Sequence, residues 1–461
     1  MTALRVALPK SWRLTDTTFA TIALATRLLI PSLHAGLYLN ANKDLRAMSA
    51  ARLLSTAASH WVHPRWRAPA GTRDRMRRLR YAVAILTSSA LLLGGCSALP
   101  GNNGDSSADG EQAAYEMSVE CPAAPSAGAI KPTVAQLNSV LAQADLPYWQ
   151  AADIGASARL KDGRLIWVFG DTIRRIGVAP GMVANSMLIT SGLCLSQLMA
   201  TARGPIIPDV QPGTVRWPMS VTVVEEDGVE KIVVFIGRIR RGSSTDVWGF
   251  RYLGSDAVTF TVEPGKAPQL DGILPLTPDV DNANQINWGS AAMVSDGYIY
   301  VYGTELPRGT AFGRSLRVGR SALSHATDKQ TWQFWDGARW QDDPVKASVI
   351  IPAVGGVSQT LSVDNIDGTF VAVSKKDGDL GSTVTTWSSQ TPVGPWKRTA
   401  ALEAPFLTGK DEFAYAPLAH PEVLLADGKL LVSISRNTTD LARLRQNPTI
   451  GRPKFAEVDR P

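Results

Sequence analysis

Two aspartates, Asp153 and Asp171, have the side chains and the spacing that could perform hydrolytic chemistry. Asp153 lies in the segment AADIGAS, and Asp171 follows the run WVFG, which is rich in strand-forming residues. The dipeptide Asp162-Gly163 lies midway between them and is a strong signal for a hairpin turn. Two arms of equal length would return both carboxylates to one edge of a sheet. Glycoside hydrolysis uses such a pair as its acid and its base or nucleophile. The alternative for Asp171 is a turn cap bonded to its own backbone.

The Asp-Gly signal recurs through the chain and indicates a repeat. Each copy precedes a short run of β-branched and aromatic residues, and the aspartates lie 65, 69, 71 and 60 residues apart. Both residues tolerate the positive φ angles of tight hairpin turns, so we expect these aspartates to serve turns. The five copies are Asp162-Gly163, Asp227-Gly228, Asp296-Gly297, Asp367-Gly368 and Asp427-Gly428.

This spacing predicts an all-β fold, a five-bladed β-propeller over about residues 130–461. Each repeat has room for about four strands, which is the size of one propeller blade. Long helical periodicity is nearly absent, and only residues 134–144 suggest a short helix. We expect residues 452–458 to form a strand that completes a blade begun near the N-terminus. A pair of β-sandwiches is the alternative, but it would not require such regular spacing.

The innermost strand of each blade should begin near one mouth of the central channel, where propellers usually bind ligands. Stepping back seven to ten residues from each Asp-Gly predicts which side chains converge there. A carboxylate, two indoles, an amide and an imidazole suit a carbohydrate, because aromatic faces stack on sugars while polar groups bind hydroxyls. For each residue taken alone, a packing role in the propeller is the alternative. The predicted positions are Asp153, Trp217, Trp288, Gln359 and His420, with Tyr415 in the same segment as His420.

At these residues the sequence resembles the endo-D-arabinanases of glycoside hydrolase family 183. The resemblance rests on Asp153 through Thr172 and covers nearly the whole body of the chain. In that family the first carboxylate lies in the sequence Gly-Gly-Asp-Gly or a similar one, whereas in this chain it lies in Ala151-Ala152-Asp153-Ile154-Gly155. Further matching motifs are Asn185-Ser186, Trp217-Pro218, Asn287-Trp288-Gly289, Tyr302-Gly303-Thr304 and His420-Pro421-Glu422.

The resemblance implies internal cleavage of D-arabinan, with Asp153 and Asp171 as the catalytic residues. We expect Asp153 to act as base or nucleophile and Asp171 as the acid or its electrostatic partner. It also adds Asn185 to the predicted substrate-binding residues, which are then Asn185, Trp217, Trp288, Gln359, Tyr415 and His420. The alternative function is a catalytically inactive propeller that binds wall polysaccharide or a protein partner.

The N-terminal region has the pattern of an export signal. Residues 76–80 are basic, residues 81–93 are apolar, and Leu93-Gly94-Gly95-Cys96 resembles a bacterial lipobox. We therefore predict a lipoprotein signal peptide over 76–96, lipidation at Cys96, and attachment to the outer face of the cell membrane. The alternative is an uncleaved transmembrane helix, for which the apolar run is short. Residues 1–75 would then be an extension from a misassigned start codon, or a genuine extra membrane segment.

The segment after Cys96 predicts a tether, and the predicted domain begins at residue 131. Residues 97–130 include a stretch rich in Gly, Ser and Asn, which suits a flexible tether between a lipid anchor and a domain over 131–461. Two cysteines, Cys121 and Cys194, remain after Cys96 in a chain predicted to be exported. They could form a disulfide or be two buried free thiols, and the sequence does not decide between these.

The charge distribution argues against a polyanionic partner. The net charge of the chain is +6, but residues 97–461 carry 33 basic and 38 acidic residues. We therefore expect no nucleic-acid partner and a neutral or basic ligand, namely cell-wall polysaccharide, bound by a monomer. The sequence also lacks a glycine-rich phosphate loop, paired-cysteine or histidine metal spacing, and a Gly-x-Ser-x-Gly elbow. We expect neither a cofactor nor a catalytic metal.

Overall fold

The computed structural model describes residues 114–123, 131–242, 249–309, 313–326, 328–403, 409 and 411–460. The predicted extension, signal peptide and Cys96, together with residues 97–113 of the predicted tether, lie outside these ranges. No helix in the described ranges is long and apolar enough to cross a membrane.

The described residues form five antiparallel sheets, which follow one another along the sequence as five blades. Blade 1 contains β1 (Tyr115–Met117), β2 (Ala151–Arg159), β3 (Leu165–Ile173), β4 (Met182–Val183), β5 (Ser186–Ser191) and β6 (Cys194–Ala200). Blade 2 contains β7 (Thr214–Glu226), β8 (Val229–Arg241), β9 (Phe250–Thr261) and β10 (Gln269–Pro275). Blade 3 contains β11 (Asn287–Ser295), β12 (Tyr298–Glu305), β13 (Ser315–Ala322), β14 (Gln333–Trp335) and β15 (Trp340–Gln341). Blade 4 contains β16 (Ser362–Ile366), β17 (Thr369–Lys375), β18 (Thr383–Ser389) and β19 (Lys397–Glu403), and blade 5 contains β20 (Glu412–Ala419), β21 (Leu430–Thr438) and β22 (Lys454–Val458).

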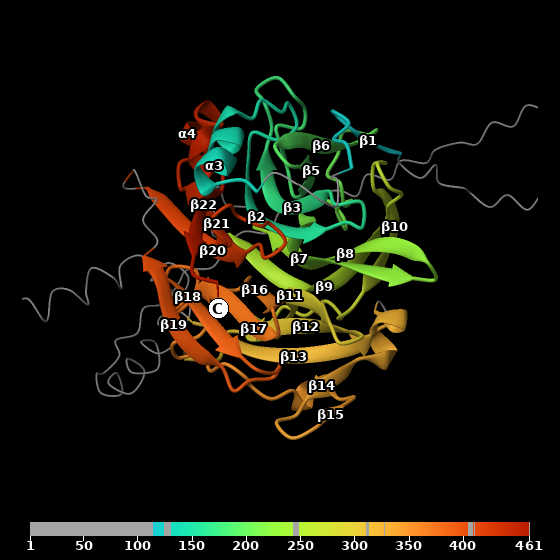
Figure 1. Ribbon diagram of the computed structural model, residues 1–461, viewed down its shortest axis with the longest axis vertical. Helices are drawn as coiled ribbons and strands as arrows, with labels where there is room; N and C mark the ends of the chain where they lie inside the picture. Colours follow the sequence, from blue (N-terminus) through green and yellow to red (C-terminus); the bar gives the residue numbers. More distant parts are fainter. Residues whose placement is uncertain are drawn as a thin grey trace, which may run out of the picture. The chain divides into compact units, whose positions relative to one another are not determined.

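The predicted five-bladed β-propeller is confirmed. The inner strands β2, β7, β11, β16 and β20 face the centre of the ring, and each contacts the inner strands of both neighbouring blades (Figure 1). The remaining strands of each blade step outward from β2, β7, β11, β16 and β20, as Figure 1 shows.

All five Asp-Gly dipeptides join the inner strand of a blade to its second strand, as predicted. Asp227, Asp296 and Asp367 have φ angles of 52°, 51° and 52°, and the glycines that follow them also have positive φ. Such a pair of positive φ angles matches the right-handed twist of the two flanking strands. The repeat in the sequence is therefore a repeat of tight turns.

Apolar layers fill the space between neighbouring blades. Val168 of blade 1 packs with Val234 of blade 2, and Phe235 of blade 2 packs with Val301 of blade 3. The same arrangement continues around the ring to the seam between blades 5 and 1, where Phe455 packs with Trp167. Each blade is thus buried on both faces, which explains the dense β-branched and aromatic runs in its middle strands.

A short helix closes the ring at the outer edge of blade 5. The predicted helix is present as α3 (Val134–Gln143), and Thr133 and Gln136 form a capping box at its start. Asn138 of α3 exchanges two side-chain hydrogen bonds with the backbone of Phe455 in β22, at 3.0 Å each. The amide side chain therefore pairs with the exposed edge of β22 as a neighbouring strand would.

Arg452 fixes the other end of this helix. Its buried guanidinium donates hydrogen bonds of 2.6 to 2.9 Å to four backbone carbonyls. Three of them belong to the last turn and the end of α3, where carbonyl groups lack partners within the helix. The four acceptors are Leu141, Ala142, Ala144 and Gln150.

Two expectations about the chain ends need correction. The C-terminal strand does not complete a blade begun near the N-terminus, because β22 pairs with β21 of the same blade. Blade 1 instead gains an N-terminal strand, β1, which pairs with β6. A disulfide between Cys121 and Cys194 joins this segment to blade 1 and settles the open question of the two cysteines. The folded region thus includes residues on the N-terminal side of the predicted boundary at 131.

Replacing Arg452 tests how much the closure contributes to stability. We expect Arg452→Met to lower the free energy of unfolding by about 2–4 kcal/mol, because four carbonyls lose a charged donor. Denaturant unfolding would measure the loss. Arg460→Met is the matched control, since Arg460 pairs with the exposed Asp367 and should cost less than about 0.5 kcal/mol. Equal small losses in both variants would show that the closure contributes little.

Candidate active site

A cavity of about 370 Å³ opens at one end of the central channel. Blades 1, 2, 4 and 5 all contribute to it, mostly through the beginnings of inner strands and the ends of second strands. Its polar lining includes Asp153, Asp171, Trp217, Arg241, Gln359, Asp379, Tyr415 and Asn437. Its apolar lining includes Ile173, Met182, Phe250, Phe413, Leu441 and Leu444, the last two from helix α4 (Leu441–Gln446).

Breaks in strand register give the inner strands room to open this cavity. The pairing of β2 with β3 shifts on both sides of Ile154, and that of β20 with β21 shifts between Tyr415 and Leu418. Ile154 and Ala416 have φ angles of 69° and 42° at these bulges. A bulge bends the strand and redirects the side chains beside it, and here those side chains are Asp153 and Tyr415.

The two carboxyl oxygens of Asp153 have different surroundings. The Tyr415 hydroxyl donates a 2.7 Å hydrogen bond to its Oδ2 atom. Its Oδ1 atom is buried and has no hydrogen-bond partner among the described residues. Oδ1 lies against Gly170, where an added Cβ atom would come within 2.3 Å of it. The glycine before Asp171 is therefore required by the position of Asp153.

Asp171 is held by two donors from blade 2. The indole Nε1 of Trp217 donates a 2.8 Å hydrogen bond to its Oδ1 atom, and the guanidinium of Arg241 forms an ion pair with the same atom. Arg241 also lies 5.8 Å from the centre of the Trp217 ring. Both contacts stabilise the ionised carboxylate.

The two carboxyls differ in their electrostatic surroundings. Burial, together with the neighbouring Asp171, raises the pKa of Asp153 to about 7, although Tyr415 and Arg241 oppose the shift. Burial also raises the pKa of Asp171, but Arg241 and the Trp217 hydrogen bond oppose that effect. Both carboxyls therefore have raised pKa values, and the two donors of blade 2 that oppose the shift hydrogen-bond to Asp171.

Two aromatic pairs flank the acids. Trp217 packs edge-on against Phe250 in blade 2, with ring centres 4.9 Å apart. Phe413 stacks on Tyr415 in blade 5, with ring centres 5.4 Å apart. Because blade 1 lies between blades 5 and 2 in the ring, the carboxyls have an aromatic surface on each side.

Five of the residues predicted from the sequence line this cavity together. They are Asp153, Asp171, Trp217, Gln359 and Tyr415. The hairpin argument for the two aspartates thus predicted their proximity. Their chemical roles stay predictions.

Three predicted substrate-binding residues lie elsewhere. Asn185 is buried and exchanges hydrogen bonds with the backbone of Ile207 and Arg216. Trp288 packs between blades 2 and 3, because β11 shifts register immediately after it. His420 is fully buried between the hydroxyls of Ser157 and Ser433, at 2.5 and 2.7 Å.

The prediction assumed a nearly constant number of residues between each Asp-Gly turn and the cavity, but this number differs between blades. In blade 5 the inner strand, β20, ends at Ala419, so His420 already lies beyond the strand. Tyr415, five residues earlier, takes the place in the cavity that was expected of His420. Bulges of different length change the offset between the turn and the cavity from blade to blade.

Sequence reasoning missed the residues at the ends of second strands and in a blade 4 loop. Arg241 ends β8 and Asn437 lies near the end of β21, just as Asp171 lies near the end of β3. A forward step of nine or ten residues from each Asp-Gly finds Asp171 and Asn437, whereas Arg241 lies fourteen residues after Asp227. Phe250, Asp379 and Phe413 carry no comparable signal.

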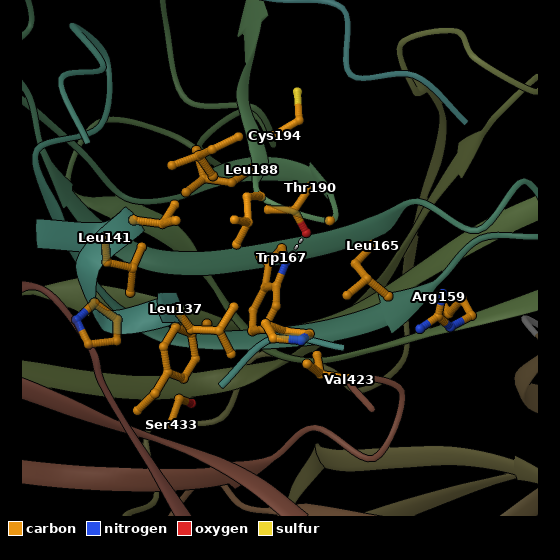
Figure 2. Close-up of a pocket in the computed structure, with 18 of the residues that line it drawn as sticks. Leu137, Leu141, Arg159, Leu165, Trp167, Leu188, Thr190, Cys194, Val423 and Ser433 are labelled. Carbon is orange, nitrogen blue, oxygen red and sulfur yellow. Dashed lines mark hydrogen bonds between the residues drawn. The ribbon is translucent and has the colours of Figure 1, made fainter. Parts of the chain in front are cut away.

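A second cavity, of about 340 Å³, lies at the seam between blades 1 and 5 (Figure 2). Leucines of α3 and the ring of Trp167 line it, and Trp167 donates a 3.0 Å hydrogen bond to Thr190 (Figure 2). No acidic residue is among the described residues of its lining, so it lacks the groups that hydrolysis requires. Nor does the described part of the chain contain a cluster of three or more His, Cys, Asp or Glu side chains that could hold a metal ion.

Comparisons with known proteins agree with the propeller. The model of a family described as "Domain of unknown function (DUF5005)" matches residues 136–460. The crystal structure of a candidate hydrolase from Bacteroides ovatus is similar, with a TM-score of 0.55 and 16% identity over 70% of this chain and 89% of that one. No curated protein matches the chain.

Two further structures show weaker similarity. One is a GH43_1 enzyme from Xanthomonas citri, with a TM-score of 0.41 and 14% identity over 69% of this chain and 92% of that one. The other is a family 43 arabinoxylan arabinofuranohydrolase from Bacillus subtilis in complex with cellotetraose. It has a TM-score of 0.44 and 13% identity over 68% of this chain and 63% of that one.

The raised pKa of Asp153 predicts how stability changes with pH. At low pH the carboxyl is protonated in both the folded and the unfolded chain. As pH rises from about 4 through about 7, ionisation favours the unfolded chain, so the stability contributed by this group is lost. Asp153→Asn cannot ionise. We expect it to melt at least about 2 °C above the wild type at pH 8 and within about 1 °C of it at pH 4.

Thermal unfolding across this pH range would test the expectation. Asp296→Asn, in an exposed turn, is the matched control and should follow the wild type at every pH. A constant difference between Asp153→Asn and the wild type would show that the Asp153 pKa is ordinary.

Proposed function

The chain belongs to the DUF5005 family, and we propose that it is a glycoside hydrolase that cleaves D-arabinan internally. One observation carries the proposal: Asp153 and Asp171 line one cavity, Asp153 with a pKa raised to about 7 and Asp171 bound by Trp217 and Arg241. A protonated acid beside a stabilised carboxylate is the pair that hydrolysis of a glycosidic bond uses. The choice of D-arabinan is supported by the sequence resemblance to glycoside hydrolase family 183.

The environments of the two acids favour a division of labour opposite to the one expected from the sequence. Asp153, with the higher pKa, would donate its proton to the oxygen of the leaving sugar. Asp171 would either take a proton from the attacking water or attack the anomeric carbon itself. Trp217 and Arg241 would orient Asp171 and favour its ionised form in this step. In either course the glycosidic bond breaks and one water molecule is consumed.

The cavity also suits a neutral chain that continues on both sides of the cleaved bond. The Trp217–Phe250 pair and the Phe413–Tyr415 pair offer surfaces on which sugar rings can stack, one on each side of the acids. An enzyme that cuts inside a polymer needs contacts with sugars on both sides. The excess of acidic residues beyond residue 96 agrees with a substrate that is not anionic.

The location of the enzyme is a further part of the proposal. A lipid anchor at Cys96 would hold the propeller on the outer face of the membrane, next to the cell wall. This part rests on the residues of the signal sequence alone.

Substitution of the two acids tests the proposal. We expect Asp153→Asn and Asp171→Asn each to lower D-arabinan cleavage at least about a hundredfold, because asparagine cannot transfer a proton or carry the charge. Release of oligosaccharides is the measurement. Asp296→Asn and Asp367→Asn are the controls and should stay within about twofold of the wild type, since both residues occupy turns. Binding of D-arabinan without cleavage by the wild type would favour the non-catalytic alternative.

The two roles can be separated by the choice of leaving group. A nitrophenyl glycoside of a D-arabino-oligosaccharide leaves without needing a proton, so Asp153→Asn should cleave it within about tenfold of the wild-type rate. Asp171→Asn should stay at least about a hundredfold slower on both substrates. Steady-state rates on the two substrates would decide. The opposite pattern would restore the assignment made from the sequence.

A further inference from the structure

Gln359 presents one end of its side-chain amide to the cavity and has the other end fixed. Nη2 of Arg314 donates a 3.1 Å hydrogen bond to Oε1 of Gln359. A guanidinium group has only donors, so the amide oxygen must face Arg314 and the NH₂ group must face away. Since Gln359 lines the cavity, its two N–H groups are available to a ligand there.

The backbone of Gln359 is fixed as well. Its carbonyl oxygen accepts a 2.9 Å hydrogen bond from the hydroxyl of Thr304. Its N–H donates a 3.2 Å hydrogen bond to Oδ2 of Asp379. With the main chain held by two blades and the amide held by Arg314, this side chain loses little freedom when a ligand binds.

Asp379 places an acceptor beside this donor. It lines the same cavity, and the ammonium group of the buried Lys375 donates a 3.3 Å hydrogen bond to its backbone carbonyl. Because one carboxylate oxygen binds the Gln359 backbone, the other is left for a ligand: no described residue donates a hydrogen bond to it.

Arg314 stands behind this pair and does not line the cavity. Burial lowers its pKa, while the charge of Asp379 opposes the shift. Its Nη1 atom is buried without a hydrogen-bond partner among the described residues. A charged side chain buried at such a cost needs a compensating role, and the guanidinium of Arg314 hydrogen-bonds to the amide of Gln359.

We propose that Gln359 and Asp379 form a subsite that binds two neighbouring hydroxyls of one sugar, and that Arg314 is its positioning residue. One hydroxyl accepts from the Gln359 amide and the next donates to the Asp379 carboxylate. The subsite lies on blade 4, apart from the two acids of blade 1. It rests on the proposed function, because the ligand is taken to be a sugar of the polymer.

A double-mutant cycle in the Asp171→Asn background tests the positioning role without turnover. The measured quantity is the dissociation constant for D-arabinan, by affinity electrophoresis, with arabinan of the L series and xylan as comparison polymers. We expect Gln359→Leu and Asp379→Asn each to weaken binding about tenfold, and Arg314→Lys about threefold. In the Gln359→Leu background, Arg314→Lys should change binding less than about 1.5-fold, because the amide it orients is absent.

Gln359→Glu adds a chemical test. The carboxylate can keep its contact with Arg314 but offers no N–H to the ligand, so binding should weaken at least as much as in Gln359→Leu. Arg317→Lys is the control for an arginine change elsewhere, since Arg317 pairs with Glu305 and does not line the cavity. It should leave binding unchanged. Melting temperatures within about 3 °C of the parent would exclude misfolding.

The outcomes separate this proposal from the proposed function. Independent effects of Arg314→Lys and Gln359→Leu would overturn the positioning role even if the enzyme cleaves D-arabinan. Binding without cleavage by the wild type would overturn the proposed function, while the cycle would still decide on the subsite. Binding of none of the three polymers would overturn both.

Discussion

The site depends on a conflict that every inner strand of the propeller must resolve. Five strands have to pack closely around a narrow channel, and yet open a space at one end that can hold a ligand. Bulges in four of the five inner strands accompany this opening, at Asp153–Gly155, Met219, Gly289–Ser290 and Ala416–Pro417. These bulges strain the backbone. Ile154, a β-branched residue, has a φ of 69°, and a backbone in this region costs on the order of 1–3 kcal/mol for a residue other than glycine. Packing of Ile154 against the core between blades 1 and 2 offsets part of it.

The electrostatics of the cavity follow from the same geometry. Bending β2 at its bulge brings Asp153 into a buried position beside Asp171, where two charges would repel each other. Blade 2 supplies two direct contacts, from the Arg241 guanidinium and the Trp217 indole N–H, and both are made to Asp171. The asymmetry between the acids is therefore produced by the neighbouring blade, since both carboxyls come from the same hairpin.

Much of the fold and part of the site could be predicted from the sequence. The remaining site residues could not, for a physical reason. The Asp-Gly turns predicted the five blades, and the equal arms around Asp162 predicted that Asp153 and Asp171 meet. Both inferences need only local turn geometry and strand periodicity. The positions of His420 and Trp288 depend on how many residues each bulge absorbs, which the sequence does not express. Arg241 and Asp379 reach the cavity through contacts between blades, which local patterns do not contain.

The way the ring closes has a consequence for where the chain can be cut. Because β22 stays within blade 5 and β1 within blade 1, each sheet is built from one continuous stretch of chain from Tyr115 to Val458. The seam is held by the side chains of Asn138 and Arg452, with no strand exchanged across it. New chain ends cut between any two blades would thus leave every sheet whole. Such a molecule is suited to circular permutation at the connections between its blades.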